Sequence, residues 1–316
     1  MNLAACLLLY SMVVTVLGPP LLARVTNSGA APRAGMAAWA AAMASVVLSW
    51  VVAAIVLVVD LVRAWGQVDR LFAACFTTLR ATAIGGYGQF LQAILAMLTA
   101  SAVLALGVLA TRVATGVRRA NVHTQRHAEA ALLAARGASR GPGGTIVVDA
   151  AEPSVYCLAS RPPTIVITTG ALGALDEEQL AAVLVHEDAH LAGRHHQLLA
   201  LARALAKILP GIRLFTEAAA EFARLAEMRA DDTAAQRHGP DTVVAALLAL
   251  TVRTPVPAPA LGASGLGVAD RVERLLFPPA SARTRLGAIL GSLLIAPMIT
   301  AVLVITQSPL CITPLS

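Results

Sequence analysis

Charged residues are scarce in this sequence: Asp, Glu, Lys and Arg make up 13% of its 316 residues, whereas hydrophobic residues make up 57%. A soluble domain has about 25% charged residues, and half that share leaves too little polar surface to cover a globule in water. The composition therefore excludes an ordinary soluble domain, and the hydrophobic content excludes a disordered chain. A mean hydropathy of +0.73 indicates a membrane protein.

Lysine and cysteine are nearly absent. Lys207 is the single lysine, and because Ala204 stands three residues before it, the chain has no Ser-x-x-Lys acylation motif. The four cysteines form no Cys-x-x-Cys pair, which argues against a disulfide framework and against a zinc site made of cysteine. The net charge of +6 comes from arginines, many of which flank apolar runs, so we expect no direct nucleic-acid binding.

Charges are missing altogether from four stretches that are long enough to cross a bilayer, which takes about 20 apolar residues. The predicted spans are residues 3–22, 36–59, 86–108 and 286–305. The first lacks a basic leader and is followed by further spans, which favours a span over a signal peptide. In the fourth, Gly287 and Gly291 form a Gly-x-x-x-Gly pair that would allow close helix packing, either within the bundle or in a homodimer.

Flanking arginines predict the orientation, because cytoplasmic flanks of membrane spans carry an excess of basic residues. Residues 60–83, which fit either an interfacial amphipathic helix or a plain loop, would face the outside. The cytoplasmic side would hold residues 24–35 and 112–285, with seven flanking arginines (Arg24, Arg33, Arg112, Arg118, Arg119, Arg283 and Arg285) against three outside (Arg63, Arg70 and Arg80). We therefore expect a multi-pass plasma-membrane protein with both termini outside.

The polar central region between the third and fourth spans has its own pattern of secondary structure. Residues 1–111 would form the first three spans, residues 112–285 a polar domain, and residues 286–316 the last span with a short tail. Periodicity and turn residues in the domain predict a basic helix at 113–137, strands at 145–149, 154–158 and 164–169, helices at 176–209 and 212–237, and a loop at 254–267. Asp176 and Gln179 fit a capping box at the start of the first long helix.

A metal-binding motif stands inside that helix: His186-Glu187-Asp188-Ala189-His190. Histidines at positions i and i+4 leave the same face of a helix, so both imidazoles can reach one zinc ion. Glu187 lies about 100° round the helix, where it can take a proton from water activated by the metal. A catalytic zinc needs a third protein ligand, and we predict Glu227, with Asp231 one turn further on placed to accept the second ring N–H of a zinc-bound histidine.

Other polar residues of the same two helices have simpler interpretations. Glu217 and Glu221 have arginines at helical spacing and fit surface pairs. His195 is predicted to be a solvated histidine or part of the cleft. His238, at a helix end, complements the helix dipole or helps to stabilise an oxyanion.

The motif, Glu227-xxx-Asp231 and the apolar spans together resemble the membrane-embedded gluzincin metallopeptidases. The order of spans is similar to the BlaR/MecR group of antirepressor peptidases and, more distantly, the chain is similar to the HtpX and CAAX prenyl protease group. The resemblance implies a mostly α membrane protein with four transmembrane helices and an inserted α+β zinc peptidase domain. It also implies one catalytic Zn²⁺ held by His186, His190 and Glu227, and a substrate paired with a strand edge at 154–158 or 164–169.

The BlaR-type receptors carry a penicillin-binding domain after the fourth span, whereas about ten residues follow it here. The resemblance therefore implies a zinc metalloendopeptidase without that sensor, cleaving a cytoplasmic winged-helix repressor in signal transduction. An HtpX-like quality-control peptidase is the alternative within the same class. A membrane receptor or scaffold with a structural zinc is the alternative of a different class, and Glu187 argues against it because a structural site needs no general base.

Overall fold

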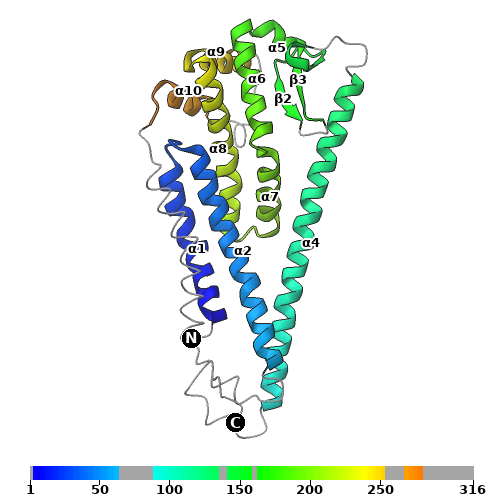
Figure 1. Ribbon diagram of the computed structural model, residues 1–316, viewed down its shortest axis with the longest axis vertical. Coiled ribbons are helices and arrows are strands. Elements are labelled where there is room, and N and C mark those ends of the chain that lie inside the picture. Colours follow the sequence, from blue (N-terminus) through cyan, green and yellow to red (C-terminus); the bar gives the residue numbers. More distant parts are fainter. Residues whose placement is uncertain (1–2, 64–87, 135–140, 159–161, 253–266, 280–316) are drawn as a thin grey trace, which may run out of the picture.

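The computed structural model describes residues 3–63, 88–134, 141–158, 162–252 and 267–279. Long helices stand side by side, and a head of shorter helices with a small sheet sits at one end of them (Figure 1). The predicted fourth span at 286–305, including Gly287 and Gly291, lies outside the described residues. So do residues 64–83 and most of the loop predicted at 254–267.

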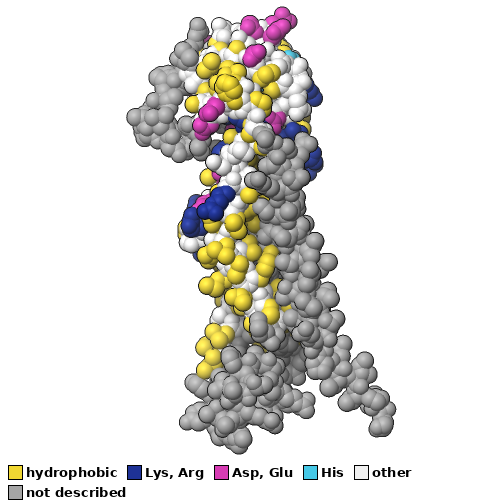
Figure 2. All heavy atoms as spheres, turned by 90° about the vertical axis from the view of Figure 1, so that its left-hand side faces the viewer, with side chains coloured by type: hydrophobic (Ala, Val, Ile, Leu, Met, Phe, Trp, Pro, Cys, Tyr) yellow, Lys and Arg dark blue, Asp and Glu magenta, His cyan; other side chains and the backbone are white. Residues whose placement is uncertain are grey.

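Among the described residues, three helices are long and apolar enough to cross a membrane: α1 (Leu3–Thr26), α2 (Pro32–Arg63) and α4 (Gly88–Ala134). Many large hydrophobic side chains on them are exposed, among them Leu8, Met12 and Leu104. In Figure 2 the described surface of the column below the head is mostly hydrophobic, whereas charged side chains lie among hydrophobic ones on the head and where the column meets it. A hydrophobic surface of this extent is unfavourable in water, and a bilayer accounts for it.

Helix α4 joins two elements that the sequence predicts separately. It runs without interruption for 47 residues, so the third span and the basic helix at 113–137 are parts of one helix. At 1.5 Å per residue it is about 70 Å long, more than twice the thickness of a bilayer core of about 30 Å. The part of α4 that is apolar enough to cross a membrane, Ala96–Val122, lies further along the chain than the span predicted at 86–108. The helix continues from the bundle along one side of the head (Figure 1).

The head contains a three-stranded sheet of β1 (Ile146–Val148), β2 (Val155–Leu158) and β3 (Thr164–Thr168), which confirms the three predicted strands. The strand order is β1-β3-β2, with β3 parallel to β1 and antiparallel to β2. In the described part of the chain β3 is the central strand, and Val166–Thr168 have β1 on one side and β2 on the other. The prediction that a substrate could pair along 164–169 is therefore wrong. The strand at 154–158 has an outer edge, so that alternative remains.

The long helix predicted at 176–209 is two helices, α6 (Glu177–Ala192) and α7 (His195–Ile208). The predicted capping box is confirmed: the Asp176 side chain accepts a hydrogen bond from the Gln179 backbone N–H, and the Gln179 side chain accepts one from the Asp176 N–H. The helix then ends at Gly193, and Arg194 takes a left-handed conformation with φ 50°. The expectation of one helix to 209 is wrong because these two residues interrupt it.

Helix α8 (Arg213–His238) links the head to the spans and closely matches the helix predicted at 212–237. Its first half packs into a buried core with α1 and α2, where Phe215, Phe222 and Trp39 are among the most buried side chains. The rings of Phe215 and Trp50 have centroids 6.1 Å apart. The second half of α8 carries Glu227 and Asp231, so the candidate site stands on a helix that is anchored among the spans.

The described part of the head also contains the shorter α-helices α5 (Thr169–Ala174), α9 (Pro240–Val252) and α10 (Val268–Leu276). A small apolar core joins α6, α8, α9 and α10. Arg274 on α10 donates hydrogen bonds to the Gly29 carbonyl, between α1 and α2, at 2.9 Å and to Asp232 on α8 at 2.7 Å. These contacts fix α10 beside the part of α8 that carries the site.

Candidate metal centre and active site

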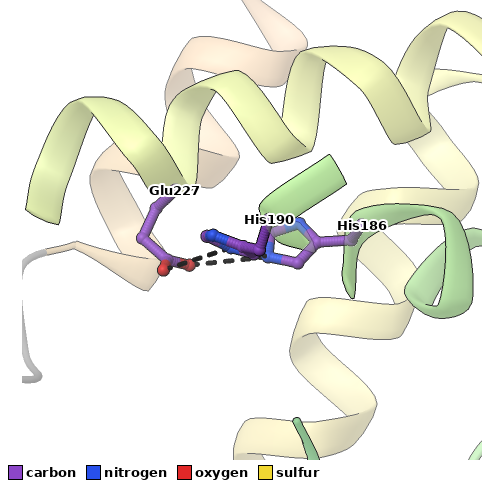
Figure 3. Close-up of side chains that lie close together, drawn as sticks. All are labelled: His186, His190 and Glu227. Atoms are coloured by element: carbon purple, nitrogen blue, oxygen red, sulfur yellow. Dashed lines mark hydrogen bonds and ion pairs between the residues drawn. The ribbon is translucent and has the colours of Figure 1, made fainter. Parts of the chain in front are cut away.

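Three side chains converge at the junction of α6 and α8. His186 and His190 project from one face of α6, and Glu227 reaches them from α8, so the two rings and the carboxylate point toward one another (Figure 3). The two Nε2 atoms are 3.1 Å apart. A Glu227 oxygen lies 3.6 Å from Nε2 of His186, and the other lies 3.5 Å from Nε2 of His190. Glu227, rather than Glu217 or Glu221, therefore shares a site with the histidines.

The spacing of these atoms fits zinc. A tetrahedral zinc with bonds of about 2.0–2.1 Å holds neighbouring ligand atoms roughly 3.3–3.4 Å apart, and the three separations here are 3.1, 3.5 and 3.6 Å. Two imidazoles and one carboxylate are also a donor set that catalytic zinc sites use. Burial and then the charge of Glu187 raise the pKa of the nearby Cys157 thiol to about 12, and this thiol is not part of the group whose ligand atoms converge.

Asp231 lies one turn beyond Glu227 and holds the outer nitrogen of His186. Its Oδ1 is 3.1 Å from Nδ1 of His186, which leaves Nε2 of that ring facing the cluster. Burial alone would lower the pKa of His186, but hydrogen bonds to Asp231 and Glu227 raise it to about 9. Burial alone would raise the pKa of Asp231, but hydrogen bonds from Arg271 and His186 lower it to about 2.

Arg271 on α10 is the residue of this cluster that the sequence analysis missed. Its guanidinium donates two hydrogen bonds of 2.7 Å to the two oxygens of Asp231, and its Nη1 lies 3.2 Å from Glu227. A bidentate pair of this kind fixes a carboxylate in orientation as well as in charge. Apart from the amphipathic pattern of its short helix, no sequence signal points to Arg271, because 40 residues separate it from Asp231.

Glu187 faces the same cleft from the neighbouring position on α6. One of its carboxylate oxygens accepts a hydrogen bond of 2.8 Å from the backbone N–H of Cys157 on β2. Burial raises the pKa of Glu187 above its usual range. A carboxylate that is held in place and takes up a proton more readily than usual is suited to general acid–base catalysis near neutral pH.

A cleft of about 360 Å³ opens beside the cluster. Its polar side is formed by two of the candidate ligands, His186 and Glu227, together with Glu187, Asp231 and Arg271. The remaining walls come mainly from β2, α6 and α9 and are largely apolar, with Val155, Val183, Val243, Ala246, Leu247 and Leu250 among their residues. The arrangement can hold a metal, a proton acceptor and an apolar side chain of a bound peptide next to one another.

The other residues predicted at the site lie outside the cleft lining. His195 is buried, with its Nδ1 2.9 Å from Nδ1 of His190, so the prediction that it is solvated is wrong. His238 is the last residue of α8, two turns beyond Asp231. Glu217 pairs with Arg213 as predicted, and Glu221 pairs with Arg224 but is half-buried and also accepts a hydrogen bond from Thr26 at the end of α1.

The low pKa of Asp231 predicts an acid-dependent loss of stability in the metal-free protein. A carboxyl group with a pKa of 3.8 when unfolded and about 2 when folded stabilises the folded state above about pH 4, and the stabilisation disappears as the pH falls through 2. The difference corresponds to about 2 kcal/mol. When the free energy of unfolding is measured between pH 2 and 5, the wild type should lose this stabilisation as the pH falls and Asp231→Asn should not. An equal pH dependence of the unfolding free energy in both proteins would contradict the prediction.

The chain matches the family model described as Peptidase family M48 over residues 118–226. The match starts on α4, takes in the sheet, both histidines and Glu187, and stops one residue before Glu227. It supports the M48 family of metallopeptidases, which are zinc enzymes, without distinguishing a BlaR/MecR-like from an HtpX-like subtype. No curated protein and no solved structure matches the chain. The match and the cluster of His186, His190 and Glu227 together indicate a metallopeptidase.

Proposed function

We propose that this chain is an integral-membrane zinc endopeptidase with His186, His190 and Glu227 as ligands of one zinc ion. The observation that carries the proposal is the convergence of these three side chains beside Glu187, within a chain that matches a metallopeptidase family. The three long apolar helices support a membrane location. A structural zinc in a receptor or scaffold would not need Glu187 in the cleft, so catalysis is the better account.

The proposed hydrolysis assigns one task to each polar residue. A zinc ion held by the three ligands would supply Lewis-acid chemistry, lowering the pKa of water towards about 7 and polarising a peptide carbonyl. Glu187 accepts the proton of the attacking water and passes it to the leaving amine nitrogen as the C–N bond breaks. Asp231 holds His186 in the tautomer that presents Nε2, and Arg271 holds both Asp231 and Glu227.

The outer edge of β2 is the proposed binding site for the substrate backbone. The Cys157 N–H donates to Glu187 instead of β3, so this edge of β2 faces the catalytic carboxylate, and Val155 two residues earlier lines the cleft. An extended peptide can satisfy its own backbone groups by pairing with an exposed strand edge. Pairing along β2 would bring the peptide past Glu187 and the metal ligands.

The apolar wall of the cleft predicts a preference for large apolar side chains next to the scissile bond. Burial of a Leu- or Phe-sized side chain is worth about 1.5–3 kcal/mol, which corresponds to a selectivity of roughly 10- to 100-fold over alanine in kcat/KM. Digestion of a peptide library by the purified protein should show this preference at one position beside the cleaved bond. Equal cleavage of peptides with Asp or Lys at every position near the bond would contradict it.

The finer proposal concerns the substrate. We propose a cytoplasmic repressor, cleaved in signal transduction, on the basis of the span order and the arginine-rich flanks. A membrane-protein substrate, as in quality control, is the second candidate, and it is favoured by the packing of α8 among α1 and α2, which places the cleft close to the proposed spans.

One experiment distinguishes the two substrates. Proteomes of cells that carry wild-type protein or Glu187→Ala are compared for new protein termini. A fragment of a soluble DNA-binding protein that is found only with wild type supports the repressor, and fragments of several membrane proteins support quality control. Identical termini in the two proteomes would contradict the peptidase proposal.

A further inference from the structure

The break between α6 and α7 brings a third histidine to the metal ligands. On an unbroken helix, residues five apart point about 140° away from each other, so His195 could not face His190. The chain instead turns at Gly193 and Arg194, and Arg194 occupies the left-handed region that few residues other than glycine adopt. As a result the rings of His190 and His195 lie edge to face, with centroids 4.9 Å apart, and their Nδ1 atoms are 2.9 Å apart.

The direction of this hydrogen bond follows from the rest of the site. Nε2 of His190 faces Nε2 of His186 and the Glu227 carboxylate, so a metal ligand at that position needs its lone pair on Nε2. A neutral imidazole carries one N–H, and the proton of His190 therefore belongs on Nδ1. Nδ1–H of His190 donates the hydrogen bond, and Nδ1 of His195 accepts it.

Gly193 provides the space that this contact requires. Its backbone angles, φ −76° and ψ −7°, suit any residue, so conformation does not demand a glycine here. A Cβ atom on Gly193 would instead collide with the His195 ring, lying 2.7 Å from Cδ2 and closer still to Nε2. The small residue and the left-handed turn thus act together to place a buried imidazole against His190.

We propose that His195 is a positioning residue that fixes the tautomer and orientation of His190 for metal binding, as Asp231 does for His186. This inference rests on the proposed zinc site but adds a residue that does not touch metal or substrate. Outer partners of metal-binding histidines typically contribute 10- to 100-fold to metal affinity. The alternative is a buried histidine that only fills space in the core.

Two substitutions at position 195 separate these roles. In asparagine, Oδ1 is joined to Cα through the same number of bonds as Nδ1 of histidine, so His195→Asn keeps the acceptor. His195→Leu keeps an apolar side chain of similar bulk but removes the hydrogen-bond acceptor. We expect the zinc dissociation constant of the full-length chain, measured by chelator competition in detergent, to rise about 10- to 100-fold in His195→Leu and to stay within about threefold of wild type in His195→Asn.

Gly193→Ala, which displaces the His195 ring without changing it, should weaken zinc binding in the same direction. His196→Leu, one residue further along α7, is the matched control and should bind zinc as wild type does. The thermal midpoint of each metal-free variant reports on folding. If His195 only fills space, leucine should replace it better than asparagine does. Zinc binding by His195→Leu that is as tight as or tighter than that by His195→Asn would therefore overturn the proposal.

Failure of this inference and failure of the proposed function give different results. If zinc affinity decreases from wild type to His195→Asn to His195→Leu but the protein cleaves no peptide, the positioning role of His195 stands and the peptidase proposal fails. If the protein cleaves peptides and all these variants bind zinc equally, the peptidase proposal stands and the role of His195 fails. In addition, ¹⁵N resonances of the histidine rings in the metal-free protein should show His190 protonated at Nδ1 in wild type and a mixed population of tautomers in His195→Leu.

Discussion

Glu187→Ala is expected to retain one zinc ion per chain and to lose peptide cleavage almost completely. Glu187 is in the cleft but outside the set of three converging ligand atoms, so its removal leaves the metal-binding side chains intact. General acid–base catalysis typically contributes 10²- to 10⁴-fold, and we expect a fall in kcat of about that size. The measurement pairs zinc content by mass spectrometry with cleavage of a peptide substrate.

The matched control for this prediction is Glu178→Ala, which removes an exposed glutamate from the first turn of the same helix. It should cleave at the wild-type rate, since its carboxylate is remote from the cleft. Loss of zinc from Glu187→Ala would show that Glu187 is a ligand, and full activity would show that another group takes the proton. Either result would contradict the role given to Glu187.

Asp231→Ala is expected to be the most destabilising of the single changes around the site. It leaves the buried guanidinium of Arg271 without its bidentate partner and His186 without its acceptor. Breaking a buried ion pair from one side costs about 3–5 kcal/mol, and the remaining contact of Arg271 with Glu227 places the expected loss near 3 kcal/mol. The thermal midpoint of the metal-free protein should fall by roughly 5–10 °C.

Two further variants test the cause of that loss. Asp232→Ala, at the next position on α8, breaks the ion pair with Arg274. Arg274 keeps its hydrogen bond to the Gly29 carbonyl, so this variant should lose less stability than Asp231→Ala. Asp231→Ala combined with Arg271→Met removes both buried charges, so the double variant should recover part of the stability lost in Asp231→Ala. With Arg271→Met alone as the second single variant, a double variant whose loss equals the sum of the losses in Asp231→Ala and Arg271→Met would show that the pair does not couple.

The sequence predicts those parts of the site that depend on local geometry. Helical spacing places His186 and His190 on one face, and the same spacing places Asp231 one turn after Glu227. The capping box at Asp176 and the three strands are local features too, because turn residues and β-branched runs determine them over a few residues. The packing of Glu227 against α6 was predicted from the residue types that zinc requires, not from a contact pattern.

The remaining features depend on contacts between distant segments. Arg271 reaches Asp231 only because α10 packs against α8, and the sequence around neither residue indicates this pairing. The break after Ala192 depends on the left-handed conformation of Arg194, which arginine does not favour, so periodicity alone predicts one long helix. That break also moves His195 from the far side of the helix to His190, which is why the sequence favoured a solvated histidine.

X-ray absorption spectroscopy of the zinc-loaded full-length protein tests the central claim most directly, since it reports the atoms bound to the metal. The account predicts one zinc per chain, with two imidazole nitrogens and carboxylate oxygen at about 2.0–2.2 Å and no sulfur. A sulfur neighbour at about 2.3 Å, a single imidazole, or a protein that binds no zinc would contradict it.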